Sequence, residues 1–313
     1  MSKRKWGESF LKSGLPLEHL TQVTLRSLGW HCEAQVEYTR PNRKRQESWF
    51  ELDLFATTFD EGDTELSFLI ECKYHDLSKF WVFLPHEPSR WHFDDRFLNC
   101  APLQTLKKPR EQTFLSLAPT SANPIVVSED GTKQDNAAYT AIQQVVNGYA
   151  PWGLDHMFGY LMDAENFADP NRPPVLALIP MIVTNAKLYR LRTTVTDLDA
   201  IRSASVPLEI ADELEWTWCF HNPSRALFGQ NMEAIAAHKA REANNLSRLR
   251  GVEARMLSFA ERPNWIAIVN IRSLAKVITL LSDAFSRLDT RLSYELPLPK
   301  SRKRTTARRK RAA

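Results

Sequence analysis

The segment with the clearest structural pattern spans residues 49–74 and reads WFELDLFATTFDEGDTELSFLIECKY. In its first part apolar and polar side chains alternate, which predicts a half-buried strand over residues 49–56 with Asp53 on the polar face. Residues 66–74 alternate in the same way, so Glu71 and Lys73 are expected to project together from a second strand. The apolar faces consist of Phe50, Leu52, Leu54 and Ala56 in the first strand and of Phe68, Ile70, Cys72 and Tyr74 in the second.

A polar connection over residues 57–64 joins the two strands, and its only glycine, Gly62, can take the positive φ that hairpin turns often need. A turn centred on Gly62 pairs the strands antiparallel and puts Asp53 opposite Glu71, with their Cβ atoms roughly 5 Å apart. Two carboxylates that close repel each other unless a cation or a donor compensates. Mg²⁺ suits this position because it takes carboxylate oxygens, keeps several waters and commonly works beside phosphates.

The alternative is a surface hairpin whose charged side chains only solvate its outer face, since exposed ion pairs contribute little to stability. Two features together favour a functional site. Glu71 is the only acidic residue of the chain that stands two positions before a lysine, and its strand is expected to pair with another acidic strand.

At these residues the chain resembles the PD-(D/E)xK nuclease superfamily, which has the restriction endonuclease-like fold, and in particular its branch of Mrr-type enzymes and archaeal Holliday-junction resolvases. The resemblance covers roughly the first two-thirds of the chain. It departs from the family pattern at Leu52, where the family name expects a Pro, and in the long segment that follows Lys73.

That branch begins with a helix that carries a Glu, continues with three strands that carry the Asp and the Glu-x-Lys, and then has a helix with a Gln. Residues 13–28 predict the first helix, with a Pro in its first turn and a Gly at its end. The resemblance makes Glu18 an additional acidic site residue, although a Glu in a first helical turn is also favoured by the helix dipole. Residues 137–149 predict the later helix, in which Gln144 is our choice for the family glutamine.

The resemblance implies that Asp53, Glu71 and the backbone carbonyl of Cys72 bind Mg²⁺, for which Mn²⁺ could substitute. Glu18 would bind the ion directly or through water. The ion would polarise the phosphate and lower the pKa of a bound water. Two neighbouring carboxylates favour the charged ammonium of Lys73, so we assign Lys73 to water orientation and charge stabilisation rather than to general base catalysis.

The expected fold class is α/β, with a restriction endonuclease-like core whose mixed central β-sheet is flanked by helices. This core is expected over residues 1–200, with an insertion at about residues 76–134. An apolar run within residues 174–192 suits a buried central strand. Residues 201–298 predict an α/β, mostly helical C-terminal extension, and residues 299–313 a disordered basic tail.

The chain has 313 residues and a formal charge of +4, of which the tail contributes eight positive charges, so the remainder carries −4. The tail is expected to bind polyanions with strong salt dependence, or else to be a plain solvated tail. A basic loop between the first two strands includes Arg43, Lys44 and Arg45, and it is expected to track a phosphate backbone. The expected partner is DNA, and a homodimer is left open.

The four cysteines are far apart and show no zinc-binding spacing, which favours reduced thiols and a cytoplasmic protein. No apolar segment is long enough to span a membrane or to form a signal peptide, so no membrane partner is expected. The leading hypothesis is a Mg²⁺-dependent endonuclease that hydrolyses DNA phosphodiester bonds in restriction or another defence role. The alternatives are a catalytically silent nuclease-fold DNA-binding module and a structure-specific repair or recombination nuclease.

Overall fold

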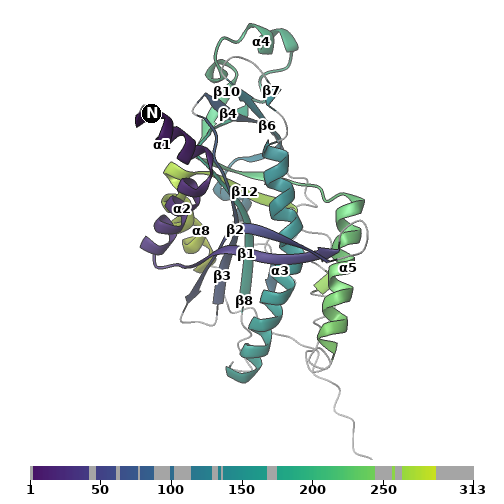
Figure 1. Ribbon diagram of the computed structural model, residues 1–313. Coiled ribbons are helices and arrows are strands. Elements are labelled where there is room, and N and C mark those ends of the chain that lie inside the picture. The colour runs from purple at the N-terminus through teal and green to yellow at the C-terminus, as the bar shows by residue number, and fades with distance from the viewer. Residues whose placement is uncertain are drawn as a thin grey trace, which may run out of the picture.

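A mixed β-sheet forms the centre of the protein, and helices flank both of its faces (Figure 1). The computed structural model describes residues 3–41, 47–60, 64–76, 78–87, 99–101, 114–128, 133–134, 137–167, 175–243, 256–257 and 263–286. Within these ranges the strands are β1 (His31–Pro41), β2 (Glu47–Asp60), β3 (Thr64–Lys73), β4 (Lys79–Pro85), β5 (Asn99–Ala101), β6 (Thr120–Ser128), β7 (Lys133–Gln134), β8 (Val175–Thr184), β9 (Lys187–Leu191), β10 (Ala211–Leu214), β11 (Trp216–Phe220) and β12 (Trp265–Asn270). The α-helices are α1 (Lys3–Lys12), α2 (Leu15–Ser27), α3 (Ala137–Phe167), α4 (Leu198–Ser203), α5 (Arg225–Arg241) and α8 (Leu274–Ser286), with short 3-10 turns η3 (Phe114–Leu117), η4 (Pro207–Glu209) and η5 (Ile271–Ser273). The expected α/β class with a mixed central sheet and flanking helices is confirmed.

The strands follow the order β1-β2-β3-β8-β12-β11-β6-β4-β9-β10, with β5 also paired to β8 and β7 to β6. Strands β1, β2 and β3 pair antiparallel in chain order, as short connections allow. Strand β3 then pairs in parallel with β8, which the chain reaches only after the long helix α3. The β2–β3 ladder runs from the pair Asp60–Thr64 to the pair Leu54–Ile70, and this is the register expected for a turn centred on Gly62.

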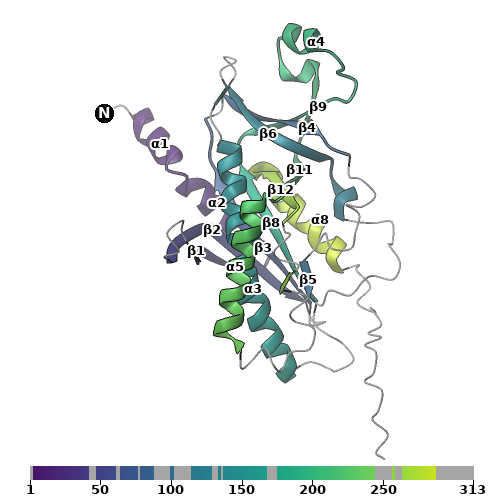
Figure 2. The same ribbon diagram turned by 90° about the vertical axis from the view of Figure 1, so that its right-hand side faces the viewer.

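Helices α3 and α5 cover one face of the sheet, and α2 and α8 cover the other (Figures 1 and 2). On the α3 face, Val145 and Tyr149 lie in the same core as Leu69 of β3. On the α2 face, Leu25 lies in the same core as Phe68, the neighbour of Leu69 in the chain. The expected alternation of Phe68, Ile70 and Cys72 is present on the α2 face, and Leu69 adds an apolar residue on the α3 face because β3 is buried on both faces.

Several element boundaries agree with the sequence. Helix α2 has Pro16 in its first turn and ends just before Gly29, which takes a φ of +86°. Helix α5 begins after Ser224, whose hydroxyl accepts a hydrogen bond from the Leu227 amide at 3.1 Å. Helix α3 is longer than expected, since it continues past Pro151 to residue 167.

The segments expected to form an insertion and a C-terminal extension both contribute strands to the central sheet. Strands β4 and β6 come from the first segment, and β11 and β12 of the second lie between β8 and β6. The proposed domain boundaries remain predictions, and the basic tail lies outside the described residues. No helix in the described part of the chain is both long and apolar enough to cross a membrane.

The side-chain alternation expected for residues 49–56 is wrong at one point. Leu52 lies in the core on the α3 face, whereas Leu54 and Ala56 lie in the core on the α2 face. A regular strand would place all three on one face. At this position the β1–β2 ladder leaves out Gln35 and Asp53, and Gln35 has a φ of +56°. The strand therefore changes face where the ladder is interrupted.

Candidate functional site

Glu71, near the end of β3, is a buried carboxylate of which one oxygen has a hydrogen-bond partner among the described residues and the other has none. Its side chain is 1% exposed, and its Oε1 accepts a hydrogen bond from Lys73 Nζ at 2.6 Å. Its Oε2 is buried and has no hydrogen-bond partner among the described residues. Burial first, and then the charge of Asp53, raise the pKa of Glu71 to about 8, although Lys73 acts in the opposite direction.

Asp53 lies one position beyond the last β2–β3 pair, so continuing the register by one step would align it with Glu71. Its Oδ2 accepts a hydrogen bond from the backbone amide of Cys72 at 2.6 Å. Burial raises the pKa of Asp53, while the Cys72 amide and Lys73 partly offset that rise. The structure therefore brings Asp53, Glu71 and Lys73 together as expected. Asp53 raises the pKa of Glu71, and Lys73 lowers the pKa of both carboxylates.

Helix α2, which lies on the face of the sheet opposite to α3, adds a third carboxylate. The pKa of Glu18 is raised by burial, then by Asp53 and Glu51, and it is lowered by Lys73. Glu51 is an acidic neighbour that we had not assigned to the site from the sequence. Its position two residues before Asp53 in an alternating strand was the available signal.

The end of β3 is held by side chains that follow β8. Thr184 Oγ1 donates to the carbonyl of Lys73 at 2.8 Å. The Asn185 side chain accepts from the His75 amide and donates to the His75 carbonyl, both at 2.7 Å. These contacts fix the backbone that carries Lys73, whose side chain is 24% exposed and reaches the site from its solvent side. Sequence reasoning missed them because nothing local indicates that β8 lies beside β3.

Cys72 contributes to the site through its backbone. Its side chain is buried on the α2 face, where Sγ lies 3.6 Å from Thr21 Oγ1. Burial raises the pKa of the Cys72 thiol well above its usual value, so the thiol stays protonated. The amide of Cys72 positions Asp53, and the metal-binding role expected for its carbonyl stays a prediction.

Gln144 lies in α3 one turn before Gly148, which places the two residues on the same side of the helix. Gly148 is packed against Leu52 and Tyr38, so this side of α3 faces the sheet beside Asp53. Gln144 Oε1 is buried and has no hydrogen-bond partner among the described residues. The helix thus turns a polar group towards the sheet, and its role in the site stays a prediction.

Carboxylate oxygens are ligands that Mg²⁺ prefers, and Glu71 Oε2 is a buried oxygen of this kind that has no hydrogen-bond partner among the described residues. No group of three or more His, Cys, Asp or Glu side chains in the described ranges is arranged to hold a metal ion. Asp53 Oδ2 is turned to the Cys72 amide and Glu71 Oε1 to Lys73, so two of the oxygens are engaged within the protein. The candidate nucleic-acid-binding residues Arg43, Lys44 and Arg45 lie outside the described residues.

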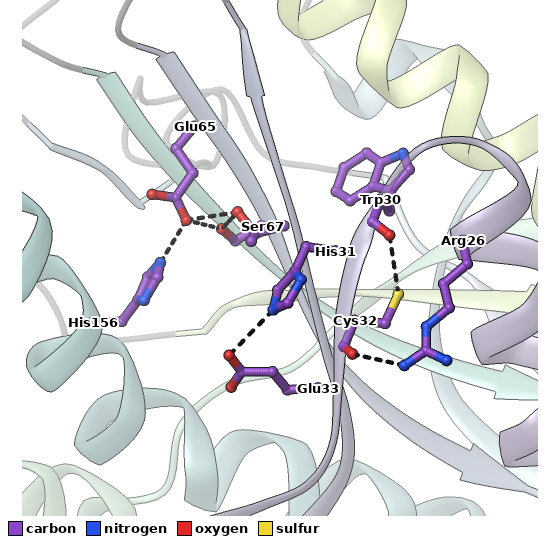
Figure 3. A network of polar contacts seen from close by, with 9 residues as sticks. Arg26, Trp30, His31, Cys32, Glu33, Glu65, Ser67 and His156 are labelled. Atoms are coloured by element: carbon purple, nitrogen blue, oxygen red, sulfur yellow. Dashed lines mark hydrogen bonds and ion pairs between the residues drawn. The ribbon is translucent and has the colours of Figure 1, made fainter.

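A second buried carboxylate, Glu65, lies at the opposite end of β3 and was not recognised in the sequence. Its Oε1 accepts hydrogen bonds from Ser67 at 2.6 Å, from Thr57 at 2.8 Å and from His156 of α3 at 2.5 Å (Figure 3). The His156 ring also stacks on Trp152, with centroids 4.7 Å apart. Burial raises the pKa of Glu65, but the hydrogen bonds outweigh burial, and the pKa is lowered overall. This network anchors α3 to the sheet.

Comparisons of the chain with protein-family models, with curated proteins and with solved structures found no match.

Proposed function

We propose that this protein is a Mg²⁺-dependent endonuclease that hydrolyses phosphodiester bonds of DNA, with a PD-(D/E)xK type of site and a role in restriction or another defence process. The observation that carries the proposal is the state of Glu71. This carboxylate is buried, one of its oxygens has no hydrogen-bond partner in the described part of the chain, and its pKa is raised to about 8. Strongly perturbed pKa values cluster at functional sites, where burial and like charges are brought together.

A divalent cation would relieve the electrostatic conflict in this site. After burial, which is the largest cause in each case, Asp53 raises the pKa of both Glu71 and Glu18, Glu18 also raises that of Glu71, and Lys73 lowers the pKa of all three carboxylates. A proton on Glu71 relieves the repulsion at neutral pH, and a metal ion at the same oxygens would replace that proton. When bound, Mg²⁺ supplies Lewis-acid stabilisation of the phosphate.

The residues of the chain have separate tasks in this proposal. Asp53 and Glu71 hold the ion, Glu18 joins them directly or through water, and the Cys72 amide fixes the orientation of the Asp53 carboxylate. Lys73 orients the attacking water and stabilises the charge that develops on the phosphate. It is hydrogen bonded to Glu71 and also partly exposed, so it can contact both the site and the solvent.

The proposal is tested by nicking of supercoiled plasmid with Mg²⁺, with Mn²⁺ and with a chelator. We expect Asp53→Asn and Lys73→Ala each to lower the cleavage rate by about 100-fold or more, because each removes a group that acts on the reacting phosphate. Matched controls are Glu213→Gln and Lys187→Ala, which change exposed residues at the far end of the sheet. Circular dichroism spectra must match the wild type. Equal cleavage by wild type and Asp53→Asn would remove the proposal.

Substrate panels separate this activity from its two rivals. A restriction or defence enzyme is expected to cut linear or supercoiled duplexes, including methylated ones, whereas a repair or recombination nuclease is expected to favour branched or single-stranded DNA. A protein that binds DNA but cuts no substrate with either metal would be a silent binding module. Neutralising Arg43, Lys44 and Arg45, or deleting residues 299–313, tests whether the basic segments supply affinity, with the largest loss expected at low salt.

A further inference from the structure

The ladder between β1 and β2 is interrupted next to the candidate site. Regular pairing stops on one side of Gln35 and Asp53 and resumes on the other side in the same register. Gln35 has a φ of +56°, a left-handed conformation that residues other than glycine seldom adopt. Strain of this kind is retained where the surrounding structure requires it, and it gathers at functional sites.

The interruption changes which face of the sheet Leu52 occupies. Leu52 lies on the α3 face, opposite to the face occupied by Leu54. Space for Leu52 exists because residue 148 of α3 is a glycine. A Cβ atom at Gly148 would lie 2.4 Å from Leu52 Cδ1 and 3.0 Å from Tyr38 Cε1. Gln35 in β1 and Gly148 in α3 therefore both allow β2 to change face between Leu52 and Leu54. Gln35 does so through its backbone conformation, and Gly148 does so by leaving room for Leu52.

Asp53 is the residue at the centre of this distortion. Its carboxylate accepts a hydrogen bond from the Cys72 amide at 2.6 Å, just beyond the last pair of the β2–β3 ladder. The Cys72 amide of β3 thus donates to the Asp53 side chain, where a regular ladder would supply a backbone carbonyl of β2. This placement brings Asp53 beside Glu71, since the two residues follow the last β2–β3 pair, Leu54–Ile70, by one step of the register.

We propose that Gln35 and Gly148 are positioning residues, which turn β2 at Asp53 so that its carboxylate meets the Cys72 amide beside Glu71. Gln35 acts through its left-handed backbone and not through its amide, because its side chain is exposed and makes no hydrogen bond among the described contacts. Gly148 acts by leaving room for Leu52. The catalytic consequence rests on the function proposed above, whereas the positioning of Asp53 does not.

Substitutions at Gln35 distinguish backbone conformation from side-chain chemistry. Gln35→Gly and Gln35→Asn keep access to a positive φ and should preserve the geometry at Asp53, because Gly and Asn tolerate the left-handed region. Gln35→Val should disturb it, because a β-branched residue strongly resists a positive φ. Glu37→Val is the matched control, since it adds the same side chain at an exposed position of β1 that pairs regularly with Glu51.

The first readout is the backbone amide signal of Cys72 in nitrogen-15 correlation spectra recorded over a pH series. In the wild type this amide proton should shift as Asp53 titrates, because the carboxylate accepts its hydrogen bond. We expect the pH-dependent shift to persist in Gln35→Gly, Gln35→Asn and Glu37→Val and to be lost in Gln35→Val. The second readout is nicking with Mg²⁺, which should fall about 10-fold or more in Gln35→Val alone among these variants.

Gly148→Ala tests the contact between α3 and Leu52, and it should also weaken the pH-dependent shift of the Cys72 amide. Adding Leu52→Ala should restore that shift, because the smaller side chain frees the space that the new Cβ occupies. If Gln35→Val does not fold, Gln35→Ala replaces it in the comparison. An unchanged Cys72 signal in both Gln35→Val and Gly148→Ala would overturn the inference. A loss of the pH-dependent shift in Gln35→Gly as large as that in Gln35→Val would overturn it as well. A wild type that never cuts DNA would end the proposed function while the amide comparison still decides the positioning role.

Discussion

Replacing Glu71 with Gln should change how the stability of the protein depends on pH. The pKa of Glu71 is raised from 4.5 to about 8 in the folded protein, so the folded state binds a proton more tightly than the unfolded state. The stability associated with that proton is fully present below pH 4.5. It is lost as pH rises through the folded pKa near 8, because the unfolded chain ionises freely and the folded one does not.

The size of the effect follows from the shift in the pKa. A rise from 4.5 to about 8 corresponds to on the order of 5 kcal/mol between the protonated and the charged form. Most of this difference develops between pH 5 and pH 9, where about 4 kcal/mol of folding free energy should be lost by the wild type. Glu71→Gln keeps a carbonyl oxygen for the Lys73 hydrogen bond but carries no charge, so it should lack this loss.

The assay is urea unfolding followed by circular dichroism at several pH values, without metal. The informative quantity is the difference in unfolding free energy between wild type and Glu71→Gln, since the titration of all other groups largely cancels. This difference should fall by about 4 kcal/mol from pH 5 to pH 9, and Glu213→Gln, an exposed control, should show no such trend. Adding Mg²⁺ at pH 8 should stabilise the wild type and not Glu71→Gln. A difference that stays flat across this pH range would refute the account of Glu71.

Three further outcomes are expected. His156→Gln should destabilise the protein by about 2 kcal/mol at neutral pH, and the effect should shrink below pH 4.5 in urea unfolding, because the lowered pKa of Glu65 means that its contribution is lost on acidification. Asn231→Leu should cost about 2 kcal/mol, because it removes the acceptor 2.7 Å from the buried Arg40 guanidinium; a double-mutant cycle with Arg40→Met should recover much of the loss. Cys219, whose thiol pKa burial raises to about 12, should react with a disulfide reagent at pH 8 at least about 100-fold more slowly in the folded protein than in urea, and rapid native labelling would contradict its burial.

The local part of this site could be predicted because it depends on periodicity and on one short connection. Alternation placed Glu71 and Lys73 on one strand, and a turn around Gly62 predicted the register that pairs Leu54 with Ile70. The helix that carries Glu18 could be predicted from its Pro and Gly boundaries. Each of these inferences uses interactions between residues that are close in the chain.

The remaining parts depend on long-range packing that one sequence does not encode in a readable form. The position of β8 beside β3 decides which side chains hold the Lys73 backbone, and the two strands are separated by about one hundred residues. The left-handed conformation of Gln35 could not be predicted, since glutamine has no preference for a positive φ. Alternation fails at Leu52 for the same reason, because the change of face follows from that backbone conformation and from the space at Gly148.

Glu65 and Glu71 show why burial alone does not identify a functional carboxylate. Both lie on β3 and both side chains are 1% exposed, yet the pKa of Glu65 is lowered and that of Glu71 is raised to about 8. Three donors converge on one oxygen of Glu65, and they compensate its charge within the protein. Among the described residues Glu71 accepts a hydrogen bond only from Lys73, and the carboxylates of Asp53 and Glu18 raise its pKa, so its charge is compensated only in part. The fold supplies enough donors for Glu65 and could have supplied them for Glu71 in the same strand. We therefore expect a ligand at the end of β3, beside Glu71.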